Sequence, residues 1–500
     1  MFESAELDHA IDKARWRREE PRLRADLLDV QFELGQLATF PVIVLVNGVD
    51  GAGKGETVNL LNSWMDPRHV RVHAFADPVE QDRRRPFMWR YWQALPPKGK
   101  VGVLFGSWYT YPIQERVMGR LRRGALDQAL DEIDAFEQML ASEGALVVKF
   151  WFHLSKKAQK QRLKRLEKDP ATRWRVTPED WKNHARYDAY REVSEHVLQR
   201  TSSGHAPWYV VAGEDDRYRG LTVGRILLEA MRRRLAQEKE GVRATIASAA
   251  PPAPPPADGK DVVGALDLSL RLPEAAYERE LERQQGRLAL LCRRKAFRRH
   301  SLVVAFEGSD AAGKGGAIRR VTGALDARLY RVVPIAAPTE EERAQPYLWR
   351  FWRHVPPQGR VAIFDRTWYG RVLVERVEGF AREADWMRAY AELVGFEEQL
   401  SRAGAVVVKF WLQISPEEQL KRFRAREKTR FKRFKITPED WRNRKKWSDY
   451  ERAVRDMVDR TSTAVAPWTL VEANDKRWAR VKVLRTIADR LEAALDGSRG

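Results

Sequence analysis

The chain has a single cysteine, no apolar leader at its start and no apolar run as long as a membrane span. One cysteine, Cys292, excludes an intramolecular disulfide framework and is typical of proteins in the reducing cytosol. The first residues lack the features of a secretory signal, and no apolar run approaches the ~20 residues that cross a bilayer. We therefore expect a cytoplasmic protein that does not bind membranes.

Negative charge is also scarce relative to positive charge. Ninety Lys and Arg residues stand against 70 Asp and Glu residues, which gives a formal net charge of +20 at pH 7. An excess of this size implies an acidic partner, either a nucleic acid, an anionic membrane or a small or polymeric phosphate. With 500 residues and 43% hydrophobic content, the chain is expected to form two or more globular domains.

The chain also lacks a hydroxyl residue at one position of a glycine-rich motif. A glycine-rich stretch, 308–316, follows the apolar run 302–305 and precedes residues with helical spacing. Strand, glycine-rich turn, lysine and helix in this order predict a phosphate-binding loop. The residue after the lysine is glycine, where most such loops carry the Ser or Thr that binds magnesium. The residues predicted to bind phosphate here are Gly308, Ala312, Gly313, Lys314 and Gly315.

The loop pattern occurs twice. Lys54 lies in a second copy at 47–56, and it precedes Lys314 by 260 residues. The same offset relates Trp108-Tyr109 to Trp368-Tyr369 and holds without a gap over most of each half. This spacing indicates duplication of a whole domain, because solenoid repeats have periods of ~20–50 residues.

A proline-rich stretch separates the two halves. Residues 247–259 include five prolines and are predicted to form a semi-extended linker outside either core. The predicted domains are therefore 1–246 and 260–500. In the second, the predicted strands are 302–306, 330–335, 361–365, 405–412 and 468–472. The predicted helices include 314–325, 376–402, 416–428, 438–459 and 476–495. Alternating strands and helices predict an α/β fold with a parallel sheet covered on both faces, and the first half shows the same pattern.

An acid and a base end one of the predicted strands. Asp365 and Arg366 directly follow the buried run 361–364. Phosphate-loop enzymes place a magnesium ligand at this kind of position. Because Gly315 has no side chain to bind metal, Asp310 and Asp365 are the predicted metal ligands. The alternative is that Asp310 caps the loop and Asp365 pairs with Arg366.

The strongest concentration of positive charge follows the fourth strand. From Lys421 to Lys446 there are thirteen Lys or Arg residues and three acids. So many like charges would repel one another without an anion, so we interpret this segment as a lid over phosphates. A solvated surface face is the alternative. Arg371, in the segment after the third strand, is also predicted to reach phosphate.

The halves differ where the chemistry is expected. At the constant offset, Asp365 corresponds to Phe105 and Arg366 to Gly106, although Lys54 is retained. Without the second carboxylate, the proposed metal site cannot form in the first half. We therefore predict that the N-terminal half is inactive and acts as a packing or regulatory partner.

Taken together, these motifs resemble the type-2 polyphosphate kinase family, in its fused two-domain form. The resemblance rests on the loop at 308–315, on Phe364 to Arg371, on Val374 to Val377 and on Lys435 to Asn443. It implies a P-loop kinase fold with a helical lid, dependence on magnesium or manganese, and phosphoryl transfer from inorganic polyphosphate to AMP, giving ADP. It implies that Asp310, Lys314, Asp365 and Arg366 carry catalysis. It also implies that lid residues hold the polymer, for which we expect Lys432, Arg433 and Lys435.

Three other readings remain open at this point. An ATP-dependent nucleoside monophosphate kinase would explain the loop, and a polyphosphate kinase acting on diphosphates would differ in the acceptor. A nucleic-acid-binding module would explain the charge but not the paired acids, so no nucleic acid is expected. A homo-oligomer and a pseudo-dimer within one chain are both compatible with the sequence.

Overall fold

The chain forms two compact units in the computed structural model, which describes residues 1–241 and 261–497. The side chains of Phe431, Lys432 and Lys435 are not described, and the predicted linker at 247–259 lies outside the described residues. The N-terminal unit comprises Met1–Pro78, Arg90–Ile246 and Thr339–Trp349. The C-terminal unit comprises Val79–Trp89, Ala247–Pro338 and Arg350–Gly500.

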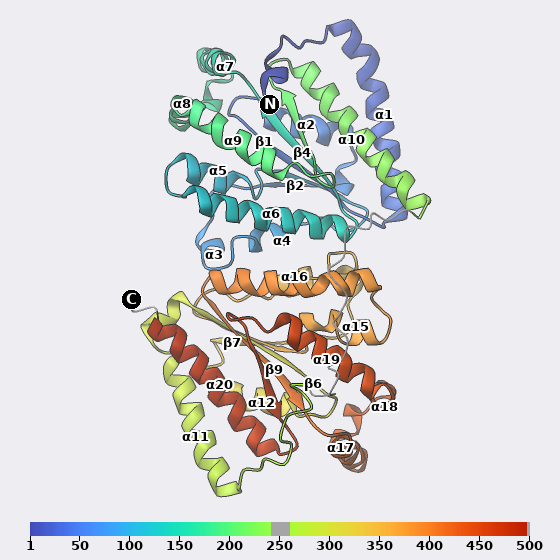
Figure 1. Ribbon diagram of the computed structural model, residues 1–500. Coiled ribbons are helices and arrows are strands. Elements are labelled where there is room, and N and C mark those ends of the chain that lie inside the picture. Colours follow the sequence, from blue (N-terminus) through green and yellow to red (C-terminus); the bar gives the residue numbers. More distant parts are fainter. Residues whose placement is uncertain (242–260, 498–500) are drawn as a thin grey trace. The chain divides into compact units, whose positions relative to one another are not determined.

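Each unit contains one sheet of five parallel strands. The strand order is β2-β3-β1-β4-β5 in the N-terminal unit and β7-β8-β6-β9-β10 in the C-terminal unit, so the first strand of each copy is central (Figure 1). The predicted parallel α/β fold and the domain duplication are confirmed. The strands are β1 Val42–Gly48, β2 Val70–Ala74, β3 Val101–Phe105, β4 Leu146–His153, β5 Trp208–Ala212, β6 Ser301–Gly308, β7 Tyr330–Pro334, β8 Val361–Asp365, β9 Ala405–Gln413 and β10 Trp468–Glu472.

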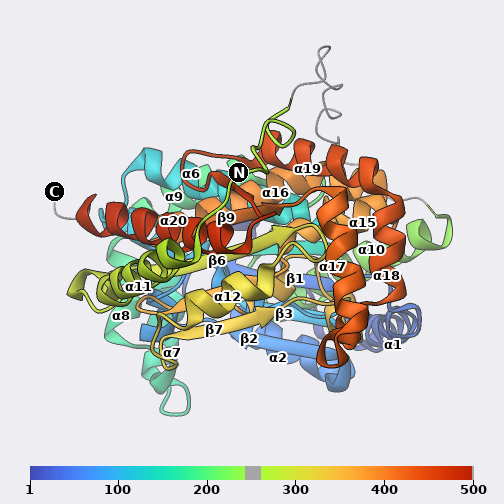
Figure 2. The ribbon, with the colours of Figure 1, turned by 90° about the horizontal axis from the view of Figure 1, so that it is seen from below.

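Helices cover both faces of each sheet. In the C-terminal unit α11, α12 and α20 pack on one face, and α16 and α19 on the other (Figures 1 and 2). The helices in the first half of the chain are α1 Lys13–Leu37, α2 Lys54–Trp64, α3 Glu80–Arg83, α4 Trp89–Ala94, α5 Thr110–Val117, α6 Arg123–Ser142, α7 Lys156–Lys168, α8 Pro178–Ala185, α9 Tyr187–Thr201 and α10 Asp216–Lys239. The helices in the second half of the chain are α11 Glu274–Leu291, α12 Lys314–Thr322, α13 Glu340–Arg343, α14 Trp349–Trp352, α15 Val374–Val377, α16 Glu383–Arg402, α17 Pro416–Lys428, α18 Pro438–Lys445, α19 Trp447–Thr461 and α20 Lys476–Gly497. None of the described helices combines the length and apolar character that crossing a bilayer requires.

The core of the C-terminal unit lies between β6, β9 and the helices α11, α12 and α20. The strands contribute their apolar runs, which are buried over nearly their whole length because both faces of the sheet are covered. Cys292 belongs to this core. Burial raises the pKa of its thiol to about 12, which makes it a poor nucleophile.

Two predicted helices are interrupted, and these predictions were wrong in that respect. The helix predicted at 376–402 divides into α15 and α16, because the chain turns at Gly379, which has φ +74°. The helix predicted at 438–459 divides at Lys446, where the backbone leaves helical geometry (φ −101°, ψ 28°). Apolar spacing continues through both breaks, so periodicity did not reveal them. The helix predicted at 314–325 ends at Thr322.

A buried ion pair fixes the segment that follows β8. Lys409 Nζ lies 2.7 Å from Glu397 Oε2, and both side chains are almost completely buried. Lys409 also donates to the hydroxyl of Tyr369, at 2.7 Å, and Trp368 and Tyr369 both donate to Glu397. Burial raises the pKa of Glu397 and lowers that of Lys409, and their mutual attraction opposes both shifts.

The N-terminal unit repeats this network. Lys149 Nζ lies 2.6 Å from Glu137 Oε2, and Tyr109 donates to the same carboxylate. The N-terminal unit has this network although it lacks the acid and base that correspond to Asp365 and Arg366. We therefore infer that the network positions the segment after the strand and takes no part in catalysis.

Candidate active site

The phosphate loop connects β6 to α12. Gly308 has φ +152°, and a Cβ there would lie 2.6 Å from the carbonyl oxygen of Leu412, so only glycine allows β6 this close to β9. Gly313, with φ +115°, turns the chain into the helix. Lys314 Nζ donates to the carbonyl oxygen of Gly308 at 2.6 Å, which holds the ammonium inside the loop. A lysine at a helix N-terminus is an anion-binding arrangement.

The backbone amides of the loop are not equivalent. α12 begins at Lys314, so the amides of Lys314 and Gly315 have no acceptor within the helix. A Cβ at Gly315 would meet no atom within 4 Å, so this glycine leaves open space at the helix end. The amide of Ala312 donates to the carbonyl oxygen of Ser309 at 3.0 Å and so stabilises the loop's own turn. The predicted phosphate contacts therefore suit Lys314 and Gly315 better than Ala312.

Asp310 is held in place from two directions. Its Oδ2 accepts a hydrogen bond from Nδ2 of Asn443, on α18, at 2.9 Å. Its Oδ1 lies 3.6 Å from a guanidinium nitrogen of Arg366, and its side chain is mostly buried. The loop, the lid helix α18 and the end of β8 thus meet at this carboxylate.

Asp365 and Arg366 lie at the same edge of the sheet as the loop. Asp365 is the last residue of β8 and pairs with Phe306 of β6 in the ladder. The amide of Arg366 donates to the carbonyl oxygen of Phe306 at 3.1 Å. Burial opposes the charge of Arg366, but the nearby carboxylates, led by Asp310 and Glu307, outweigh it, and its pKa is raised. The parallel sheet therefore brings together Asp310, Lys314, Asp365 and Arg366, as predicted from their positions at strand ends.

Sequence reasoning missed Glu307, which anchors this edge. Its side chain is buried, and Oε1 accepts hydrogen bonds from the amide and hydroxyl of Thr367 at 2.7 and 2.8 Å. Burial raises the pKa of Glu307, against the opposing charges of Lys314 and Arg366. An acid at the end of an otherwise apolar strand was the available signal. Its counterpart in the N-terminal unit is Asn47.

Backbone strain is concentrated at this site. Among the described residues, the non-glycine residues with positive φ are Ala38, Ala311 and Arg366, and the last two have φ +65°. Their N-terminal counterparts are Gly51 (φ +78°) and Gly106 (φ +71°), which adopt such angles without strain. A left-handed conformation persists in a bulky residue only where its surroundings enforce it, and such residues cluster at functional sites.

Arg422, on α17, hydrogen-bonds the backbone of the phosphate loop. This residue was not identified from the sequence. Its guanidinium donates to the carbonyl oxygens of Ala311 and Ala312, both at 2.9 Å. It also donates to the carbonyl oxygen of Ala473, after β10, at 2.7 Å. This buried arginine ties the phosphate loop to the neighbouring strand end and to the first lid helix.

The lid consists of α17, a short 3-10 helix at Arg430–Lys435 and α18. Arg433 is exposed, and its Nε donates to the carbonyl oxygen of Glu427 at 3.0 Å. The side chains of Lys432 and Lys435 lie outside the described part of the chain. The three predicted polymer contacts therefore remain predictions.

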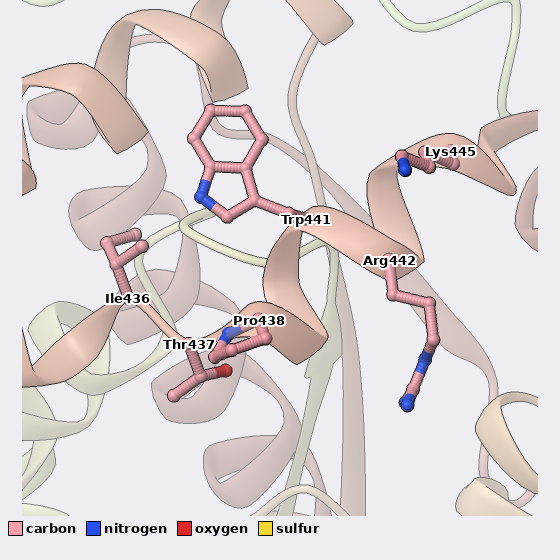
Figure 3. A pocket seen from close by; sticks show the side chains of 6 residues that line it. All are labelled: Ile436, Thr437, Pro438, Trp441, Arg442 and Lys445. Carbon is pink, nitrogen blue, oxygen red and sulfur yellow. The ribbon is translucent and has the colours of Figure 1, made fainter.

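A shallow pocket opens beside α18. In Figure 3 Trp441 and Arg442 extend in different directions from the middle of this helix. Trp441 packs edge-on against Phe423 of α17, with ring centroids 5.2 Å apart, which joins the two lid helices. The pocket is lined by Ile436, Thr437, Pro438, Trp441, Arg442 and Lys445.

Arg371 lies after β8 and is largely buried. It pairs with Glu375 at 3.2 Å, so its charge is partly neutralised within the protein. Its counterpart at the constant offset is Tyr111. The predicted contact between Arg371 and phosphate remains a prediction.

Asp310 and Asp365 fit a magnesium ion by donor chemistry. Both supply carboxylate oxygens, the hard donors that magnesium and manganese prefer. In the described part of the chain no cluster of three or more His, Cys, Asp or Glu side chains is arranged to hold a metal. Two carboxylates suit an ion that takes its remaining ligands from water and substrate phosphates, as magnesium commonly does.

The N-terminal unit keeps the loop but differs around it. Asn183 donates to Asp50 at 2.9 Å, and Lys54 Nζ donates to the carbonyl oxygen of Gly48 at 2.6 Å, as in the C-terminal unit. The strand that corresponds to β8 ends in Phe105, which supplies no acid.

A carboxylate lies at the start of α2, the helix that follows the phosphate loop of the N-terminal unit. Glu56, on the first turn of α2, is the counterpart of Gly316. It pairs with three arginines, at distances of 2.8–3.2 Å, which are Arg162, Arg175 and Arg219. Arg175 corresponds to Lys435, one of the predicted polymer contacts. Cations that face a phosphate site in this unit are thus already paired with an internal anion.

Comparisons with known proteins agree with these features. The profile of the family described as Polyphosphate kinase 2 matches residues 10–239 and 271–498. A Pseudomonas aeruginosa protein named polyphosphate:AMP phosphotransferase is 59% identical over 494 residues, covering 99% of each chain. A protein of the same name from Acinetobacter johnsonii is 39% identical and covers 95% of this chain and 97% of its own. The crystal structure of a polyphosphate kinase 2 from Pseudomonas aeruginosa superposes with a TM-score of 0.88 at 56% identity, and each chain is covered completely. With two matched copies and full-length relatives, this chain belongs to the polyphosphate kinase 2 family.

Proposed function

We propose that this chain transfers a phosphoryl group from inorganic polyphosphate to AMP, giving ADP, and that the C-terminal unit catalyses the transfer. The observation that carries the proposal is the meeting of Lys314, Asp310, Asp365 and Arg366 at one edge of the sheet, below a basic lid. The names of the full-length relatives support the donor and the acceptor. A basic lid also suits a polymer with about one negative charge per phosphate.

The chemistry needs positioning and charge neutralisation more than covalent help from the protein. A phosphate oxygen of AMP attacks the terminal phosphorus of the polymer. The bond from that phosphorus to the next bridging oxygen breaks, and the polymer leaves one phosphate shorter. Bound magnesium supplies positive charge beside the transferred group.

Each residue of the site has a defined part in this scheme. Lys314 and the first amides of α12 hold the phosphates that flank the transfer. Asp310 and Asp365 would hold magnesium, and Asp310 also orients the attacking oxygen. Arg366 neutralises charge that develops on the transferred group, as an arginine does in other phosphoryl transferases. Lys432, Arg433 and Lys435 clamp the polymer. A cytoplasmic location is part of the proposal, because a chain with one free, buried cysteine is typical of a reducing compartment.

The proposal includes an N-terminal half, residues 1–246, that does not catalyse transfer. Its third strand ends in Phe105 and Gly106, so the second carboxylate and the arginine are missing. Glu56 also pairs with three arginines near its phosphate loop. A unit that keeps the loop without these groups can support the fold or regulate the chain.

Matched lysine substitutions separate the two units. Lys314→Ala is expected to lower turnover by about a hundredfold or more, because it removes a preorganised charge at the reacting phosphates. Lys54→Ala is expected to leave turnover close to that of the native chain. Both are measured as ADP formed from AMP, polyphosphate and magnesium. Loss of turnover with Lys54→Ala but not with Lys314→Ala would reverse the assignment of the units.

The donor and acceptor are tested with the intact chain. ADP is expected to form from AMP and magnesium when polyphosphate is the donor, and removal of the metal with EDTA should stop it. Formation of ADP with ATP as the only efficient donor would instead indicate a nucleoside monophosphate kinase. Efficient transfer to ADP but not to AMP would indicate a diphosphate-specific enzyme.

A further inference from the structure

A buried carboxylate, Glu378, holds two cations of the lid. Its side chain is 4% exposed, and Oε2 lies 3.1 Å from Arg442 Nε and 3.1 Å from Lys446 Nζ. Asn443, between these two residues in the chain, donates to Asp310. One short stretch of the lid therefore contacts both the carboxylate of the phosphate loop and Glu378.

Polar atoms beside this carboxylate are left without partners. Within the described part of the chain, Glu378 Oε1, Asn443 Oδ1 and the hydroxyl of Tyr450 are buried and make no hydrogen bond. Burial, followed by the negative charges of Glu378 and Asp310, raises the pKa of the Tyr450 hydroxyl. Buried polar atoms without partners are rare and need an explanation. These three atoms suit a polar ligand held between the phosphate loop and the lid.

The N-terminal unit builds the same region without the carboxylate. Met118 is the counterpart of Glu378, whereas Lys182 and Arg186 keep the two cationic positions. Lys182 pairs instead with Glu179 at 3.2 Å. The helices α8 and α9 have the same bounds as α18 and α19 at the offset of 260 residues. Glu378 is therefore not required to build this part of the fold.

The hydrogen bonding of the tyrosine hydroxyl also differs between the two units. In the N-terminal unit the hydroxyl of Tyr190, the counterpart of Tyr450, donates to Asn183 Oδ1 at 3.4 Å. In the C-terminal unit the corresponding atoms, on Tyr450 and Asn443, have no partner among the described residues. The copy with the catalytic acid and base is thus the one in which these atoms are available to a ligand.

We propose that Glu378 selects a nucleoside monophosphate over a diphosphate as the phosphoryl acceptor. The proposal rests on the proposed function, because it concerns the acceptor of that reaction. Arg442 and Lys446 flank Asn443, which contacts Asp310, and pairing with Glu378 leaves the three charged groups with one net positive charge instead of two. An additional acceptor phosphate would meet a buried carboxylate and partly neutralised cations. Like charge in a buried site is strongly unfavourable, and such repulsion gives specificity.

The test compares AMP and ADP as acceptors, with polyphosphate and magnesium present. Glu378→Met introduces the residue that the N-terminal unit carries, and Glu378→Gln removes the charge with little change of shape. We expect the ratio of kcat/KM for AMP to that for ADP to fall about tenfold or more in both variants, mainly because ADP becomes a better acceptor. Asp449→Asn removes an exposed carboxylate next to Tyr450 and should leave the ratio unchanged.

Each outcome decides between the roles of Glu378. An equal loss of activity with both acceptors would show that Glu378 only supports the lid, and would overturn the proposal. An unchanged ratio would overturn it as well. If the methionine variant melts at a much lower temperature, the glutamine variant decides, since it keeps the shape of the side chain. Failure of the native chain to use AMP would overturn the proposed function itself, which the native control reveals before any variant is measured.

Discussion

Replacing Arg366 with glycine is expected to lower turnover by about 10³- to 10⁵-fold, the range found for arginines that stabilise phosphoryl transfer. The same change is expected to leave the protein as stable or slightly more stable. Arg366 has φ +65°, a conformation that costs a non-glycine residue about 1–2 kcal/mol. Glycine relieves this strain but is more flexible in the unfolded chain, so the net gain should be about 0.5–1 kcal/mol.

The N-terminal unit shows that this exchange is compatible with the fold. Gly106, at the equivalent position, has φ +71°, and its amide makes the same hydrogen bond to the preceding central strand as that of Arg366. Stability is measured by thermal melting and turnover by ADP formation. Arg366→Lys serves as the control, because it keeps a charge and the strain but loses the planar guanidinium. If Arg366→Gly keeps turnover within tenfold of the native value, Arg366 does not stabilise the transition state.

Replacing Asp365 with asparagine is expected to lower turnover by about a thousandfold, because a metal in such a site contributes several kcal/mol of charge stabilisation. The amide has nearly the same shape as the carboxylate but is a much weaker ligand for magnesium. Asp365 lies at the end of β8, where its backbone pairs with β6, and the substitution leaves that pairing intact. The fold should therefore be preserved.

The measurement is turnover as a function of magnesium concentration, with a thermal melt of each variant. Glu398→Gln is a matched control, since Glu398 is an exposed acid on α16 that lies 3.9 Å from Arg402. Substantial residual activity of Asp365→Asn at saturating magnesium would contradict the assignment of Asp365 as a metal ligand. A similar loss in the control would point to a general effect of charge.

The features that could be predicted are those carried by neighbouring residues. The run 302–306, the glycines and Lys314 follow one another within thirteen residues, so the strand, loop and helix were readable together. The duplication acted as an internal alignment. It showed that Asp365 and Arg366 have been replaced by Phe105 and Gly106 without any knowledge of the fold.

The supporting residues could not be predicted because their partners lie far away in the chain. Glu307 bonds Thr367, which is 60 residues later, and Asp310 is held by Asn443, which is 133 residues later. Arg422 reaches both the phosphate loop and Ala473. Each was one charged or polar residue among many in a chain with 90 Lys and Arg residues.

Local order in the chain was thus sufficient for the fold class, the two copies and the copy that retains the acid and base. Packing of distant segments decided the rest. It forces Arg366 into a left-handed conformation, places Glu56 among three arginines and buries Glu378 against the lid. The physical reason is that strand and loop patterns arise from adjacent residues, whereas burial, backbone strain and ion pairing depend on which segments the folded chain brings into contact.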